Sequence, residues 1–365
     1  MKKESDIAIL YPHIAHYRED FFKELLKYHC FDIFTYINNE ESINNNFYIS
    51  KLETKKLNSR IFLKRLRLFN FLPLLSNKYK VIILIGEMQV LPTWIVMILS
   101  KLLKKKIILW GHGISIHTYL DEQKQIKTSR LLYHKLADYI WLYTEKEKVI
   151  WSKYLDPAII TSLNNTLDIN KILNQETLDK KVLKEKYNIK SKITLIYCAR
   201  FSLYERRTDL LVEIIKKLDS EKFSFIIIGD GKLKPDFSTF KNVNDFGAVY
   251  DDKLKNELFN IADLYIQPGW IGLSANEALA YGKPILTFKR SNEIKQCVEY
   301  AYLNNKNSFI AEDIKDMINF LENISNEKIL LLQNNAKKFA KENLTLDLMA
   351  LNASKSLDKI KGDIK

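Results

Sequence analysis

The sequence predicts an α/β protein with two doubly wound domains. The first observation is length, because 365 residues are long for a single core and suit two domains of ordinary size. The second is that short β-rich runs alternate with helix-length amphipathic segments in both halves of the chain. The third is that these runs are apolar on both faces, which is typical of parallel strands covered by helices on either side.

Each half of the chain contains its own set of expected strands. In the first half they are residues 6–11, 31–37, 81–86, 106–111, 139–144 and 158–165. In the second half they are residues 193–200, 223–231, 244–249, 262–267 and 284–288. We place the first domain at 1–165 and the second at 166–345, with a C-terminal helix at 346–365 that returns to the first domain. Polar turn residues replace the apolar pattern near 164–172.

The composition is that of a soluble globular protein, with 47% apolar and 28% charged residues. Glu4 and Asp6 interrupt the N-terminus where a signal peptide would need an apolar core, so a cytoplasmic location is expected. Cys30, Cys198 and Cys297 are far apart, which favours buried thiols over a disulfide framework or a zinc site. The most apolar window, 90–103, is too short to span a bilayer and is expected to form a core helix.

The formal net charge of +13 is concentrated in one segment, Lys51 to Lys80. Nine basic residues there face a single acidic one, Glu53, and apolar side chains alternate with them between 61 and 72. This mixture favours the surface of an anionic membrane or an anionic amphiphile as partner. The alternative is a solvated helix face whose other side packs on the domain. Nucleic acid is not expected, since no recognition motif accompanies the charge.

The stretch ADLYIQPGWIGLSANEALAYGKPILTF, residues 262–288, leads from a strand into a helix with few bulky side chains. Unpaired N–H groups and the helix dipole make such an N-terminus a phosphate site when nothing blocks the approach. Glu277 lies about one turn into the helix, where it can accept hydrogen bonds from vicinal hydroxyls such as those of ribose. The expected donor-binding residues in this loop are Gly269, Gly272, Leu273, Ser274 and Glu277.

Two further elements fit the same ligand. Arg200, Arg206 and Arg207 follow the strand at 193–200, and the sequence GDG at 229–231 ends the next strand. At the carboxyl edge of a parallel sheet these residues would supply cations for a diphosphate and, at Gly231, room for a base. The second half therefore predicts a nucleotide diphosphate site.

These residues resemble the GT-B fold glycosyltransferases, and among them the retaining group numbered family 4, of the bacterial polysaccharide, O-antigen and capsule type. Similar elements occur in the family's order at 165–168, 198–211, 226–237 and 257–286. The resemblance implies two Rossmann-like domains facing each other across a cleft, and it places Arg200 and Arg206 on the positions that hold the donor diphosphate. One departure is that the family usually has a first glutamate at the position of Gly269, where it contacts the transferred sugar.

The first half of the chain contains fewer residues that indicate a binding or catalytic site. His16, Tyr17 and Arg18 follow the first strand, at the loop that the resemblance directs toward the acceptor. His112 lies between Gly111 and Gly113 at the end of a strand, where catalytic groups occur in such sheets. Glu87, which also ends a strand, is a candidate for the acceptor hydroxyl. Packing or surface roles remain the alternative for each histidine.

The resemblance implies transfer of a sugar from a nucleotide diphosphate sugar to a glycan or a lipid-linked glycan at the inner membrane face, with retention of anomeric configuration. No D-x-D motif is present, so no metal cofactor is expected and Arg200, Arg206 and the loop at Gly272 would stabilise the leaving diphosphate. His112 would hold the donor sugar. The alternative is a catalytically silent nucleotide-sugar or anionic-lipid binding protein. A dehydrogenase is disfavoured, because GDGKLKPDF lacks the third glycine of a dinucleotide fingerprint.

Overall fold

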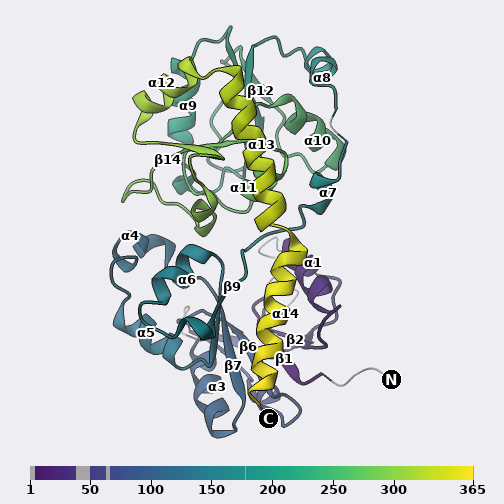
Figure 1. Cartoon of the computed structure of the whole chain (residues 1–365), viewed down its shortest axis with the longest axis vertical. Helices are drawn as coiled ribbons and strands as arrows, with labels where there is room; N and C mark the ends of the chain where they lie inside the picture. The colour runs from purple at the N-terminus through teal and green to yellow at the C-terminus, as the bar shows by residue number, and fades with distance from the viewer. Residues whose placement is uncertain (1–4, 38–49, 63–65, 177, 365) are drawn as a thin grey trace. The chain divides into compact units, whose positions relative to one another are not determined.

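The computed structural model describes residues 5–37, 50–62, 66–176 and 178–364. The chain divides into two compact units, Met1–Asp168 with Leu346–Lys365, and Ile169–Thr345 (Figure 1). Each unit has a parallel sheet with helices packed on it, so the expected α/β class with two Rossmann-like sheets is confirmed. The units are described in turn.

The first unit is built on a parallel sheet with strand order β3-β2-β1-β6-β7-β8-β9. The central strands are buried on both faces, as in Ile7, Ala8, Ile82 and Ile83 at 0% exposure. The strands are β1 (Ile7–Tyr11), β2 (Asp32–Thr35), β3 (Lys55–Lys56), β6 (Val81–Ile85), β7 (Lys106–Gly111), β8 (Tyr139–Leu142) and β9 (Ile160–Ser162).

Helices flank this sheet, and the last helix of the chain belongs to it. α14 packs against α1, as Figure 1 shows. Two hydrogen bonds fix it, from Trp141 Nε1 to Ser356 Oγ at 2.8 Å and between His29 Nε2 and Ser354 Oγ at 3.0 Å. The helices are α1 (His16–Leu25), α3 (Leu91–Leu102), α4 (Tyr119–Glu122), α5 (Thr128–Lys135), α6 (Glu145–Trp151) and α14 (Leu346–Gly362).

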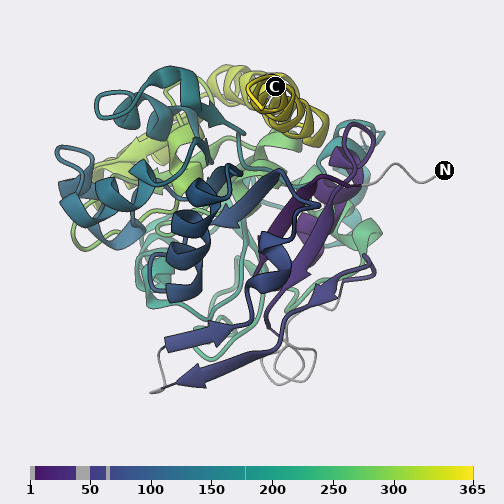
Figure 2. The same cartoon turned by 90° about the horizontal axis from the view of Figure 1, so that it is seen from below.

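The basic segment of the first unit forms a β-hairpin, so the solvated helix face considered for it is wrong. β4 (Ser59–Phe62) pairs antiparallel with β5 (Leu66–Phe69), and Figure 2 shows the two strands side by side. The alternation of apolar and basic residues at 66–68 has the period of two that a strand requires. A 3₁₀ turn, η1 (Leu72–Leu75), follows, while residues 63–65 of the segment lie outside the described residues.

Two other expectations for the first unit need correction. The apolar window forms α3, but that helix is only half buried: Val96 and Met97 lie in the core, whereas Leu102 is 76% exposed. Cys30 is exposed, so it is not the buried thiol that was expected. Within the part of the chain that is described, no helix is long and apolar enough to cross a membrane.

The second unit is built on a parallel sheet with strand order β12-β11-β10-β13-β14-β15. Its strands are β10 (Ile193–Cys198), β11 (Phe223–Ile228), β12 (Val243–Asp245), β13 (Leu264–Ile266), β14 (Ile285–Phe288) and β15 (Ser308–Ala311), of which β15 was not expected from the sequence. Its helices are α7 (Asn170–Leu173), α8 (Lys180–Lys186), α9 (Thr208–Lys217), α10 (Asp252–Ile261), α11 (Ser274–Ala280), α12 (Ile314–Asn323) and α13 (Asn326–Asn343). The carboxyl ends of β10, β11 and β13 carry the residues expected to bind the donor.

Candidate active site

The three arginines of the loop after β10 have different surroundings. Arg206 ends the 3₁₀ turn η4 (Tyr204–Arg206), and its Nε and Nη1 are buried with no hydrogen-bond partner among the described residues. Arg207 instead pairs with Asp209 at 2.7 Å, and Arg200 is exposed. Since buried polar groups are rarely left unpaired, these two nitrogens distinguish Arg206 from Arg207 and Arg200.

A buried tyrosine joins this loop to the start of α11. The Tyr265 hydroxyl lies 3.0 Å from the Cys198 carbonyl oxygen, 2.7 Å from Gln267 Oε1 and 3.1 Å from Ser274 Oγ. Burial raises the pKa of Tyr265 well above its usual value, while the nearby Arg206 charge acts to lower it. Arg206 and Ser274 therefore lie at the same edge of the sheet.

Two buried amides hold the loop between β13 and α11. Gln267 donates from Nε2 to the carbonyl oxygens of Trp270 at 2.8 Å and Gly269 at 3.3 Å. Gln296 accepts from the Ile271 backbone N–H at 2.9 Å, and both glutamines are 0% exposed. Trp270 is in a left-handed conformation with φ 48°. Neither glutamine was expected from the sequence, because a single Gln has no motif that marks it as a loop support.

The glycines at the carboxyl edge of this sheet differ in how closely other atoms surround them. A Cβ at Gly269 would lie 2.2 Å from the Glu205 carbonyl oxygen, and one at Gly231 would lie 2.4 Å from the Phe201 carbonyl oxygen. Gly231 also has φ +148°. At Gly272 a Cβ would meet nothing within 4 Å. The chain at Glu205 thus occupies the space that a side chain at position 269 would need.

Glu277 has a partner that the sequence did not reveal. α11 begins at Ser274, directly after Leu273, so Glu277 lies in its first turn. Lys255 Nζ donates to both Glu277 carboxylate oxygens at 2.7 Å. Burial acts to lower the pKa of Lys255, but neighbouring groups, with Glu277 first among them, more than offset it, so that pKa is raised. Lys255 lies in α10, in the sequence KLKNELF, where nothing distinguishes it from a surface lysine.

In the first unit, His112 lies on a loop whose conformation is fixed by contacts with Trp151 and Glu147. A Cβ at Gly113 would lie 2.4 Å from Trp151 Nε1, so this position requires glycine. The Gly113 N–H donates to Glu147 Oε1 at 3.0 Å, and Thr144 Oγ1 donates to the other oxygen of that buried carboxylate at 3.2 Å. Glu147 therefore positions the loop, a role that was not expected from the sequence.

The imidazole of His112 packs edge-on against Tyr143, with ring centroids 4.6 Å apart. The residue is exposed to solvent, yet desolvation by surrounding protein, reinforced by the charges of Arg18 and Arg130, lowers its pKa to about 4. His112 is thus neutral at pH 7, able to donate one hydrogen bond and to accept another.

The other acceptor-side candidates differ in accessibility. His16 is exposed and Tyr17 is half-buried. Arg18 is 2% exposed, donates to Asn165 Oδ1 at 2.8 Å and lies over the Trp110 ring at 5.0 Å. Arg18 therefore already links α1 to the segment after β9, and its contact with an acceptor stays a prediction.

Glu87 follows β6 and accepts a hydrogen bond from the Tyr36 hydroxyl at 3.1 Å. Burial raises the pKa of Glu87, although this hydrogen bond and the Arg67 charge act to lower it. A carboxyl group with a raised pKa at the carboxyl edge of a sheet suits a general base.

The two groups of residues lie at the carboxyl edges of two separate sheets. The second unit brings Arg206, Ser274 and Tyr265 together, with the Lys255–Glu277 pair at the same edge. In the first unit the candidates follow β1, β6 and β7, which are neighbours in the sheet. Among the described residues, no three His, Cys, Asp or Glu side chains are grouped so as to hold a metal ion.

This architecture is that of the GT-B glycosyltransferases. Residues 192–327 match the family described as Glycosyl transferases group 1, which confirms the resemblance for the second half of the chain. No curated protein matches the sequence significantly.

Solved structures support the fold over nearly the whole chain. A glycosyltransferase from Rickettsia africae is 16% identical with TM-score 0.67, and the match covers 99% of each chain. The lipopolysaccharide outer core galactosyltransferase WaaB is 13% identical with TM-score 0.67, covering 97% of this chain and 99% of WaaB. Anabaena HepE, in complex with UDP and glucose, is 13% identical with TM-score 0.64, covering 97% of this chain and 99% of HepE. These structures show the fold, and the family match extends over residues 192–327 of the second half.

Proposed function

We propose that the protein is a retaining glycosyltransferase that moves a sugar from a nucleotide diphosphate sugar to a glycan acceptor. The observation that carries this proposal is Arg206, whose two buried nitrogens have no partner among the described residues at the sheet edge where β10 and β13 end. A diphosphate would satisfy both nitrogens and neutralise the charge. The UDP bound in HepE is consistent with such a ligand.

In this proposal each residue has a defined task. Arg206, helped by the exposed Arg200, stabilises the diphosphate as negative charge develops on it, without a metal ion. Glu277 accepts hydrogen bonds from the ribose hydroxyls, and Gly231 leaves room for the base. The neutral His112 hydrogen-bonds the donor sugar. The bond from the anomeric carbon to the diphosphate breaks, the acceptor oxygen bonds to the same face of that carbon, and the acceptor proton passes to the departing phosphate.

For the acceptor we propose a glycan carried on a lipid at the inner face of the cytoplasmic membrane. The basic segment Lys51 to Lys80 supports this, because it contains exposed apolar side chains, with Ile61 in β4 at 56% and Leu72 in η1 at 66% exposure. Each basic residue near an anionic leaflet contributes about 1 kcal/mol, and salt screens the attraction. Sedimentation with anionic vesicles should therefore recover the protein at low salt and release it at high salt. Equal binding to neutral vesicles would contradict the membrane part.

The decisive experiment incubates the protein with a panel of nucleotide sugars and measures release of the nucleoside diphosphate. Thermal stabilisation by the same panel selects the donor, because a ligand that binds the folded state raises the melting temperature. NMR of the product reports the anomeric configuration, and a chelator tests independence from metal. Stabilisation by a donor without any release over repeated turnovers would favour the silent binding protein instead.

A further inference from the structure

A polar pocket of about 310 Å³ lies in the second unit, at the amino edge of its sheet. Its walls come from α10, α11, α13 and the chain after α7, all labelled in Figure 1, and from the residues that precede β13 and β14. The candidate donor-binding residues follow β10, β11 and β13 at the opposite, carboxyl edge, so this pocket is a separate feature. Its volume is at the lower end for ligand pockets and suits a monosaccharide better than a nucleotide sugar.

Lys283 brings a buried ammonium group to this pocket. It is 8% exposed, and its Nζ donates to the Ala262 carbonyl oxygen at 2.8 Å, but it forms no ion pair within the part of the chain that the structure describes. Asp263 is already engaged, because its Oδ1 pairs with Lys180 and its Oδ2 accepts from the Thr194 N–H at 2.9 Å. Burial lowers the pKa of Lys283 to about 8. Since a buried cation without a counter-ion is costly, an anion in the pocket would be stabilised.

The other charged residues of the lining leave a second lysine available. Lys337, on α13, is exposed and forms no ion pair with any described residue. Its charge and that of Lys180 both act to lower the pKa of Lys283, so the three lysines lie near one another. The acidic side chains printed among the described lining residues are Asp263, which Lys180 neutralises, and Glu176, which is exposed. Lys283 and Lys337 therefore remain for an anion.

Amide side chains supply much of the remaining polar lining. Gln175 Oε1 is buried and has no hydrogen-bond partner among the described residues. Asn260 donates from Nδ2 to Asn256 Oδ1 at 3.0 Å, and Gln333 donates from Nε2 to the Asp263 carbonyl oxygen at 2.9 Å. Amide oxygens accept hydrogen bonds from hydroxyl groups and amide N–H groups donate to them. Amides beside two available lysines match a ligand that has several hydroxyls and one acidic group.

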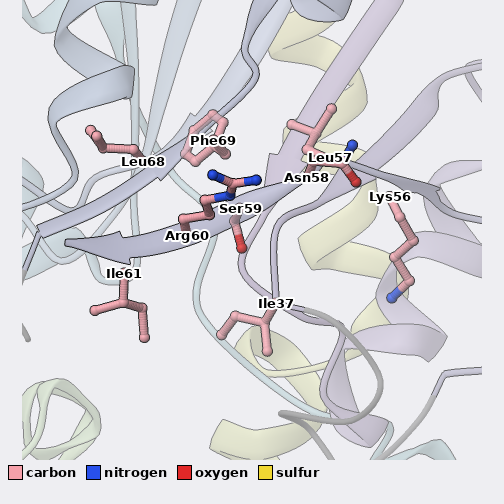
Figure 3. A pocket seen from close by; sticks show the side chains of 9 residues that line it. All are labelled: Ile37, Lys56, Leu57, Asn58, Ser59, Arg60, Ile61, Leu68 and Phe69. Atoms are coloured by element: carbon pink, nitrogen blue, oxygen red, sulfur yellow. The ribbon is translucent and has the colours of Figure 1, made fainter.

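The pocket on the hairpin of the first unit differs in both respects. It is larger, about 650 Å³, but its two cations Lys56 and Arg60 are exposed and point apart, as Figure 3 shows. Ile61, the neighbour of Arg60 on β4, points to the other side of the strand. Charge and apolar surface therefore do not converge there as the lysines and amides do in the second unit.

Two helices connect the amino-edge pocket to the candidate ribose-binding pair. On α10, Asn256 and Asn260 line the pocket, and the adjacent Lys255 pairs with Glu277 at 2.7 Å. α11 contains Glu277 in its first turn, and its last residue, Ala280, lines the pocket. The seven residues of α11 span about 10 Å. A ligand held between α10 and α11 would therefore restrain the same helices that hold the Lys255–Glu277 pair.

We propose that this pocket is a regulatory site for a monosaccharide that carries a phosphate or a carboxylate. Lys283 and Lys337 bind the acidic group, and the amides of Gln175 and Asn260 bind the hydroxyls. Occupation strengthens binding of the nucleotide diphosphate at the carboxyl edge by holding α10 against α11. By linkage, the nucleoside diphosphate strengthens binding of the acidic sugar by the same factor. The regulatory part rests on the proposed function, whereas binding of the acidic sugar does not.

The binding test is calorimetric titration of the full chain with glucose 6-phosphate and with glucuronate, which distinguishes the two acidic groups. Glucose and inorganic phosphate are the control ligands, since each supplies only part of the proposed contacts. Lys283→Met should weaken binding of the acidic sugar about tenfold, the size of one charged hydrogen bond. Lys337→Gln should weaken it about threefold, because that lysine is exposed. Lys338→Gln, on the same helix but outside the lining, is the matched control and should bind like wild type.

Two further variants and measurements keep the interpretation specific. A sugar phosphate also fits the candidate diphosphate site, so the titration is repeated with Arg206→Ala, which should retain binding. Circular dichroism shows whether Lys283→Met is folded, and Lys337→Gln tests the same pocket without a change in the core. The regulatory part is measured as the affinity for UDP and for GDP with and without saturating acidic sugar. We expect about fivefold tighter nucleotide binding in the wild type and no such change in Lys283→Met.

Three outcomes would overturn the binding site: neither acidic sugar binds more tightly than glucose and inorganic phosphate, both lysine variants bind like wild type, or Arg206→Ala alone abolishes binding. Binding of the acidic sugar without any change in nucleotide affinity would overturn the regulatory part. A chain that binds the acidic sugar in this pocket but releases no nucleoside diphosphate from any donor would contradict the proposed function and leave the binding site supported. The two proposals therefore fail separately.

Discussion

In the second unit the candidate loop between β13 and α11 is held by buried side chains, whereas in the first unit two of the candidate side chains, His16 and His112, are exposed. Gln267 and Gln296, both fully buried, fix the chain between β13 and α11, and the Glu205 backbone packs directly on Gly269. His16 and His112 in the first unit are exposed instead, and the hairpin pocket is half open.

The difference follows from the ligands that we propose for the two units. A diphosphate and a ribose have fixed shapes, so backbone and buried amides can be arranged around them before binding. A lipid-linked glycan has a long chain and a variable sugar, for which exposed cations and apolar side chains are sufficient. Substitutions in the loop between β13 and α11 should therefore disrupt folding and binding together, whereas substitutions of the exposed side chains in the first unit should affect binding alone.

The largest effect is expected from Gly269→Glu, which would restore the family's glutamate. Its Cβ would lie 2.2 Å from the Glu205 carbonyl oxygen, so the loop at 204–207 must move. Overpacking of this kind costs roughly 1–3 kcal/mol of stability, and here it would also displace Arg206. We expect a lower melting temperature and no detectable nucleoside diphosphate binding by calorimetry.

The matched control is Gly272→Ala, whose Cβ would meet nothing within 4 Å. Its melting temperature should equal that of the wild type. If Gly269→Glu were equally stable and bound the donor more tightly, the loop would be adaptable and the contrast between the units would fail.

Arg206→Ala should have the next largest effect. Loss of the unpaired cation should reduce kcat/KM by a factor corresponding to about 2–4 kcal/mol, while the melting temperature changes little because the buried nitrogens have no partner to lose. Arg207→Gln is the control, since that side chain already pairs with Asp209. Equal losses of kcat/KM in the two variants would indicate a general effect of charge. Inactivation of the wild type by EDTA would contradict metal-independent stabilisation of the diphosphate.

The sequence was sufficient to predict the strands whose apolar residues form a continuous run. The expected strands correspond to β1, β2, β6 to β9 and β10 to β14, because runs buried on both faces are continuous in apolar residues. It missed β15 (Ser308–Ala311), β3 (Lys55–Lys56) and the hairpin of β4 and β5, where the basic residues favoured a membrane-binding surface or a helix face.

Residues of the candidate site could be predicted from the sequence only where they are glycines in a loop or belong to a recognisable motif. Gly231 and Gly269 were candidates because glycine leaves room for a ligand, and the structure shows that close contact of main chains also excludes a side chain there. Lys255, Gln267 and Glu147 could not, since each acts through a partner that is distant in sequence and is identified only in the folded chain.

A smaller effect is expected from the Lys255–Glu277 pair. Glu277→Ala should weaken binding of the free nucleoside diphosphate as well as the donor, by roughly tenfold for one lost charged hydrogen bond. Lys255→Gln should have a similar effect, because it leaves the carboxylate without the partner that orients it. The double variant should lose little more than either single variant, since the two residues act together. Additive losses, or a wild type that binds deoxyribose donors equally well, would place Glu277 away from the ribose.

The smallest effect concerns pH and tests the first unit. The folded-state pKa of His112 is lowered to about 4, below the value of about 6.5 for an unfolded histidine, so the unfolded chain binds more protons between these values. Its contribution to stability is therefore complete above pH 6.5 and is lost as the pH falls toward 4. Activity that depends on the neutral imidazole should likewise persist through pH 6 and decline only near pH 4 to 5.

NMR titration of the His112 ring, assigned by comparison with His112→Gln, measures this directly. A midpoint near 6.5 would show that the ring titrates as an ordinary exposed histidine, and kcat/KM would then fall through the same range. A midpoint near 4 is expected, because desolvation and the charges of Arg18 and Arg130 disfavour the protonated ring.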